Sequence, residues 1–152
     1  MSSKLQRIID AVADRLAVIN TGAGYYTDIG NSVFRNQRDP QENELPCCLV
    51  FFGERAAETQ QCENIRTAMT ITVIGYTERL SDSEDQGTQI LADIQRAVEL
   101  ADDTLGGLLR GQFGLAFVSD EIFMPEVGAN AVGARVTYSA PNVRLYGDPE
   151  II

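Results

Sequence analysis

Residues 65–77, IRTAMTITVIGYT, decide the fold that this sequence predicts. Apolar residues recur at one parity, Ile65, Met69, Ile71 and Val73, and polar residues at the other, Arg66, Thr70 and Thr72. Alternation of this kind is typical of a β-strand with one buried and one more polar face. We therefore expect a strand that lies in a sheet with one face against the core.

The preceding segment contains a second predicted strand. Residues 47–52, CCLVFF, are apolar at both parities, which is typical of a strand covered on both faces. Residues 55–64, RAAETQQCEN, show no strong pattern, so we expect a loop between the two strands.

Two further strands are predicted at 115–126, LAFVSDEIFMPE, and 131–147, AVGARVTYSAPNVRLYG. In the last one a single face carries Val132, Ala134, Val136, Tyr138 and Ala140. After Pro141 the apolar parity shifts to Val143 and Leu145. A proline at a parity shift indicates a β-bulge or an edge strand.

Two segments have the three- and four-residue spacing of an amphipathic helix. The first covers residues 3–19 and has an apolar face of Leu5, Ile8, Ile9, Val12, Leu16 and Ile19. The second begins with Ser81 and Glu84 in capping-box spacing and continues with Ile90, Leu91, Ile94 and Val98. Its acidic start, Asp82, Glu84 and Asp85, is favoured by the helix dipole. Residues 101–114 predict a short helical turn capped by Asp102 or Asp103.

The glycine-rich stretch 20–35, NTGAGYYTDIGNSVFR, nearly matches a dinucleotide-binding pattern at Gly22, Gly24 and Thr27. That pattern requires a strand before it and a helix after it, and here the helix comes first. The aromatic and β-branched residues around Gly30 and Asn31 instead predict a β-hairpin at 25–35.

The order of these elements indicates one α+β domain over residues 1–152, a two-layer structure. We expect a mainly antiparallel or mixed β-sheet with the two amphipathic helices on one face. The predicted core contains Ile8, Val12, Leu16, Leu49, Phe51, Ile71, Val73, Ile94 and Val98.

Composition restricts the function. The chain has 22 acidic and 12 basic residues, a net charge of -10, so we expect no adhesion to nucleic acid. It has no histidine, which excludes Ser-His-Asp and Cys-His catalysis within this chain and histidine-containing metal sites. The spacing of Cys47, Cys48 and Cys62 matches neither a zinc site nor a disulfide framework, so we expect buried thiols. We expect a cytosolic chain with no signal peptide, no membrane contact, no enzymatic activity, no cofactor and no metal.

Several sequence segments, in this order, resemble the tail terminator (tail completion) proteins of long-tailed bacteriophages. They are TGAGYYTDIGNSVF after the first helix, ELPCCLVFFGE, TVIGYTE, ADDTLGGLL and ARVTYSAPNVRLYGDPE. The resemblance spans most of the chain but not loops 54–64 and 79–87, and it contains no catalytic signature.

The resemblance implies a structural virion protein that forms a homo-hexameric ring on the tail tube, at the head-proximal end. It would assemble in the host cytoplasm, end tube polymerisation and form the surface for head attachment. Its partners would be the tail tube protein and the head-tail connector protein, and genomic DNA would pass through the lumen without specific binding. The candidate oligomer or partner interface contains Tyr25, Tyr26, Asp28, Asn31, Phe34, Arg35, Glu54 and Arg55.

Three alternatives stay open. The chain could be a head-completion or other connector ring protein of the head-tail junction. It could be a carboxylate-dependent metal hydrolase that holds Mg²⁺ with Asp28, Asp39 and Glu44. It could also be a host-encoded binding module.

Overall fold

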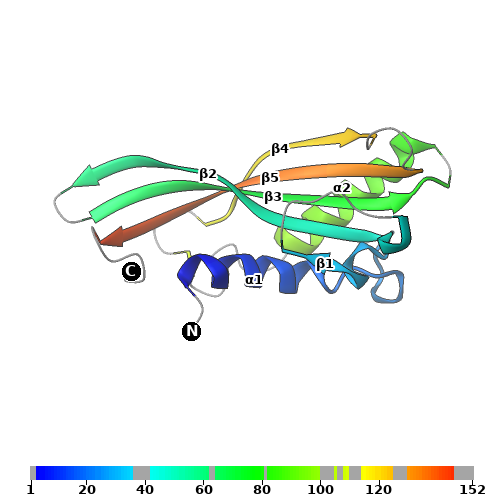
Figure 1. The fold of residues 1–152 in the computed structure, drawn as a ribbon, viewed down its shortest axis with the longest axis horizontal. Coiled ribbons are helices and arrows are strands. Elements are labelled where there is room, and N and C mark those ends of the chain that lie inside the picture. Colours follow the sequence, from blue (N-terminus) through cyan, green and yellow to red (C-terminus); the bar gives the residue numbers. More distant parts are fainter. Residues whose placement is uncertain are drawn as a thin grey trace.

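A computed structural model describes residues 3–35, 42–61, 64–80, 82–99, 105, 108–109, 114–124 and 130–145, with the backbone alone at 42, 54–61, 64–66 and 141–145. The strands there are β1 (Val33–Phe34), β2 (Cys47–Gln61), β3 (Asn64–Glu78), β4 (Ala116–Phe123) and β5 (Ala131–Leu145), and the α-helices are α1 (Lys4–Leu16) and α2 (Ser83–Glu99). The strand order is β1-β2-β3-β5-β4, with β1 parallel to β2 and the other pairs antiparallel (Figure 1). The α+β class with a mixed sheet is thus confirmed.

Both helices contribute to one apolar core against the same side of the sheet. Their buried side chains are Ile8, Val12 and Leu16 from α1 and Ile90, Ile94 and Val98 from α2. These side chains meet Ile71 and Val73 of β3, and Val132 and Val136 of β5. The expectation that two amphipathic helices cover one face is therefore confirmed.

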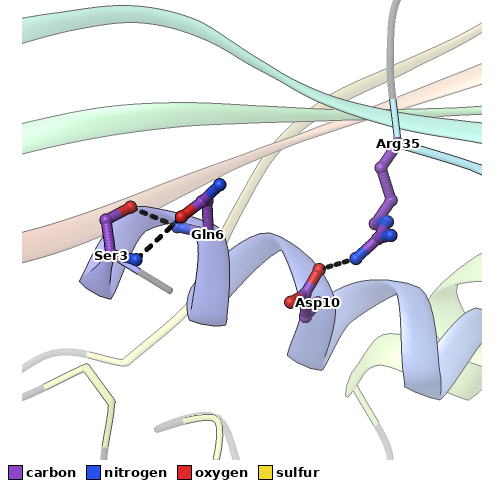
Figure 2. Close-up of polar contacts among 4 residues, drawn as sticks. All are labelled: Ser3, Gln6, Asp10 and Arg35. Carbon is purple, nitrogen blue, oxygen red and sulfur yellow. Dashed lines mark hydrogen bonds and ion pairs between the residues drawn. The ribbon is translucent and has the colours of Figure 1, made fainter. Parts of the chain in front are cut away.

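Both helices begin with a side-chain cap. Ser3 accepts a hydrogen bond from the Gln6 backbone N–H, and the Gln6 side chain accepts one from the Ser3 N–H, which forms a capping box (Figure 2). At α2 the Asp82 carboxylate accepts from the Glu84 N–H at 2.9 Å. The predicted cap Ser81 and the predicted turn with Asp102 or Asp103 lie outside the described residues.

The prediction of a loop at 55–64 is wrong for residues 55–61, which belong to β2. β2 continues to Gln61 and stays paired with β3 through the Gln61–Asn64 pair. The register shifts between Phe52 and Arg55 and again between Ala57 and Thr59, which breaks the strict alternation by which a strand is identified from sequence. In Figure 1 the ends of β2, β3 and β5 extend beyond the N-terminal end of α1.

A second, smaller cluster covers the sheet face that points away from the helices. It contains Cys47, Leu49, Ile74 and Tyr76, whereas Cys48 and Val50 lie in the helix-side core. The prediction of a strand covered on both faces is thus confirmed for Cys47–Val50. The prediction is wrong for Phe51 and Phe52, which are only half-buried: Phe51 packs at the margin of the outer cluster and Phe52 at the margin of the helix-side core.

The two adjacent cysteines follow the same alternation. Cys47 and Cys48 are both buried and belong to opposite faces of the sheet. Burial raises the pKa of the Cys48 thiol, and the neighbouring Cys47 adds to the shift. Cys48 therefore stays a neutral thiol inside the core, whereas Cys62 lies outside the described residues.

β5 has the predicted buried face from Val132 to Ala140. Pro141 pairs with Ala68 of β3 in an unbroken register, so the parity shift is not a bulge on that side. On the side of β5 that faces β4, the last described pair is Ala116 with Ser139, two residues before Pro141. Pro141 thus lies where β5 has become an edge, which is where a residue without an N–H is tolerated.

Candidate assembly interface

Residues 20–35, between α1 and β2, form a folded corner, so the prediction of a β-hairpin at 25–35 is wrong. It contains two 3₁₀ turns, Thr21–Ala23 and Ile29–Asn31, followed by the two-residue strand β1. A side chain at Gly30 would place its Cβ 2.4 Å from the Leu16 carbonyl oxygen. The chain therefore crosses directly over the end of α1, and only glycine permits this close approach.

A buried carboxylate on α2 accepts hydrogen bonds from two backbone N–H groups of the corner. Asp93 is 1% exposed and accepts hydrogen bonds from Tyr26 N at 3.0 Å, Thr27 N at 2.7 Å and Thr27 Oγ1 at 2.6 Å. Charge-assisted hydrogen bonds of this kind are stronger than neutral ones. Asp93 thus fixes the corner to α2 across 67 positions of sequence.

Two more contacts hold the same corner in place. The Arg96 guanidinium lies 4.6 Å from the Tyr25 ring centroid and donates to the Gly24 carbonyl oxygen at 2.9 Å. Asp28 accepts from the Thr21 backbone N–H at 2.8 Å and from its hydroxyl at 3.1 Å. The corner is therefore preorganised, which lowers the entropy lost when a partner binds to it.

The eight predicted interface residues differ in how exposed they are to solvent. Tyr26 is 68% exposed, and Asn31 and Arg35 are also exposed. Tyr25, Asp28 and Phe34 are half-buried, the first two within the corner and Phe34 against the outer cluster. The side chains of Glu54 and Arg55 lie outside the described residues, although both positions belong to β2.

Tyr26 lies at the rim of a depression of about 410 Å³. The depression is lined by the corner, by Leu45 and Pro46 before β2, by the end of β3, and by Gln86 and Gln89 of α2. Leu80, which is 79% exposed, lies on its wall. Large apolar side chains beside a concave surface are typical of protein contact sites.

Arg35 helps to line a second hollow. Its guanidinium forms an ion pair with Asp10 of α1, as Figure 2 shows. The hollow has a volume of about 590 Å³ and is also lined by Gln6, Ile9, Phe51 and Phe52. It lies where β1 ends, between α1 and the edge of β2.

Among the described residues, the largest group of exposed apolar side chains is on and next to β4, which was not part of the predicted interface. The exposed side chains there are Phe117 (48%), Val118 (56%), Ile122 (37%) and Met124 (47%), the last one residue beyond the strand. Phe117 packs edge-to-face on Tyr138, with ring centroids 6.3 Å apart. The signal in the sequence was the apolar run AFV followed by IFM in a segment with weak alternation.

The three carboxylates of the alternative metal site are not shown to converge. Asp28 is engaged with Thr21, and Asp39 lies outside the described residues. In the part of the chain that the structure describes, no three Cys, Asp or Glu side chains form a group that could hold a metal ion. Over the same residues, no helix has the length and apolarity that a membrane span requires.

Comparisons with known proteins give a likeness of fold without a likeness of sequence. No family model and no curated protein matches the sequence. The fold is similar to a chain in a solved structure described as the virion of a native gene transfer agent (GTA) particle. That chain is 14% identical, with a TM-score of 0.48, and the match covers 88% of this chain and 92% of the other. An overlap at this level does not assign a function.

Proposed function

We propose that this chain is a structural virion protein of a long-tailed phage or prophage that caps the tail tube as a ring. It ends tube polymerisation and forms the surface to which the head's connector attaches. It acts through protein contacts, without a cofactor, and genomic DNA passes its lumen without specific binding.

The structural observation that supports this proposal is the exposed apolar surface of strand β4 at the edge of the sheet. Four large apolar side chains on one short segment are costly to leave in water and favour burial against another protein. The preorganised corner, which presents Tyr26 beside a depression, supplies a second contact surface. The net charge of -10 suits a ring through which a polyanion slides, because like charge prevents adhesion.

The resemblance to tail terminators supplies the particular role. It favours a position at the end of the tail tube. The head-completion alternative would instead place the chain next to the portal-side ring. The metal hydrolase alternative has no comparable observation, because Asp28 already serves as a local hydrogen-bond acceptor.

The proposal can be tested with the purified tail tube and connector proteins from the same genome. We expect the chain to bind tube ends and, when added during polymerisation, to shorten the tubes in proportion to its concentration. Tyr26→Asp should weaken the binding, because it places a charge on an exposed aromatic contact. Thr88→Asp is the matched control, because Thr88 is an exposed residue of α2 that does not line the depression. Binding to the connector side alone, with tube length unchanged, would favour the head-completion alternative.

A further inference from the structure

We propose that copies of this chain join head to tail by strand addition, with β4 of one copy pairing with the outer edge of β2 in the next. This inference rests on the proposed function in that it assumes assembly of identical copies. It identifies the surfaces that meet, which the resemblance does not.

β4 has the properties of a strand that receives another strand. It is the last strand of the sheet, and its side chains are exposed from Ala116 to Ile122. Natural edge strands are commonly protected by charged side chains. β4 has two such residues, both of them exposed: Asp120 accepts a hydrogen bond from Gln95 at 2.8 Å, and Glu121 pairs with Arg135 at 2.5 Å. Phe117 and Val118 nevertheless remain 48% and 56% exposed on the same strand.

The opposite edge of the same sheet supplies the complement. β1 pairs with β2 only at Cys48 and Leu49, and β2 continues from Val50 to Gln61 with no other strand on that side among the described residues. The hollow of about 590 Å³ opens beside this edge, and Phe51 and Phe52 are half-buried in its wall. Gln6, Asp10 and Arg35 form the polar part of the hollow, and an exposed apolar side chain such as Phe117 or Val118 would meet its apolar part, Ile9, Phe51 and Phe52.

The strand directions agree with this pairing. β4 is antiparallel to β5, which is antiparallel to β3, which is antiparallel to β2. β4 and β2 therefore run in opposite directions. Copies related by rotation about an axis along the strands would place β4 antiparallel to the neighbour's β2, and such a heterologous contact forms a ring when the rotation closes.

Val118 is the residue from which the contact is best measured. It lies at the register shift between Phe117 and Ser119 and is 56% exposed. We would replace it with the photo-crosslinking residue p-benzoylphenylalanine in the full-length chain and mix isotope-labelled and unlabelled copies at about 1 mM. We expect links between copies from position 118 to the hollow, at Gln6, Ile9 or Phe52. The matched control places the crosslinker at Val18, which is 50% exposed after α1 and should give no such link.

Two blocked variants test whether the contact is head to tail. Val118→Lys should remove the β4 surface and Gln6→Trp should fill the hollow, each lowering self-association by roughly tenfold or more. An equimolar mixture of the two should form a heterodimer, because each variant retains the surface that the other lacks. Val18→Lys should associate as the unmodified chain does.

Three results would overturn the inference. Links from position 118 to β4 of the second copy, or a Gln6→Trp variant that still dimerises, would indicate a two-fold contact between equal strands. An absence of any link between copies at about 1 mM would remove the pairing itself. None of these results changes the tube-capping assay, so failure of the inference is distinguishable from failure of the proposed function.

Discussion

Val73→Asp is expected to abolish soluble, folded protein. Val73 is fully buried in the helix-side core, on the central strand β3. An unpaired buried carboxylate costs several kcal/mol, against a total stability of about 5–15 kcal/mol for a domain of this size. The measurement is the soluble yield, followed by circular dichroism of whatever remains. Leu49→Asp should have the same effect from the opposite face, where Leu49 is 1% exposed in the outer cluster.

Thr70→Asp is the matched control for this prediction. Thr70 lies on the same strand but on the other face, and it is half-buried. We expect it to fold with a stability reduced by about 1 kcal/mol. A normal melting curve for Val73→Asp would contradict the assignment of this face to the core.

Asp93→Ala is expected to lower the free energy of unfolding by about 3 kcal/mol, the second largest effect of the substitutions considered. The change leaves the N–H groups of Tyr26 and Thr27 and the Thr27 hydroxyl without the carboxylate that accepts their hydrogen bonds. It should also loosen the attachment of the corner to α2, where the contacts of Arg96 remain. Urea unfolding measures the first effect, and amide hydrogen exchange at Tyr26 and Thr27 measures the second.

Asp85→Ala provides the comparison, because it removes an exposed carboxylate from the first turn of the same helix. We expect a loss of about 0.5 kcal/mol from the helix dipole and no change in exchange at the corner. If Asp93→Ala left the unfolding midpoint and the exchange of both amides unchanged, Asp93 would not fix the corner.

The sequence predicted the elements in which one periodic pattern decides the structure. The apolar faces of α1 and α2 and the buried parity of β5 all depend on spacing within one segment, and all three are present. The two-face burial of Cys47 and Cys48 also follows from a local run of apolar residues.

The failures share a physical cause, since each depends on partners far away in the sequence or on irregular register. The corner adopts its shape because Asp93 takes its N–H donors, and no pattern in residues 20–35 reveals that partner. A signal did exist on α2, where Asp93 is a charged residue on the apolar face formed by Ile90, Ile94 and Ala97. The register shifts in the second half of β2 break the alternation that predicts a strand, and the sequence pattern of β4 predicts a strand without indicating that its apolar side chains are exposed.

Deletion of the gene from its phage or prophage tests whether this chain caps a phage tail. Lysates would be examined by electron microscopy, with the intact gene supplied in trans as the control. We expect filled heads without attached tails, together with tail tubes of abnormal or uncontrolled length. Tails of normal length attached to heads would contradict it, and normal free tails beside emptied heads would favour the head-completion alternative.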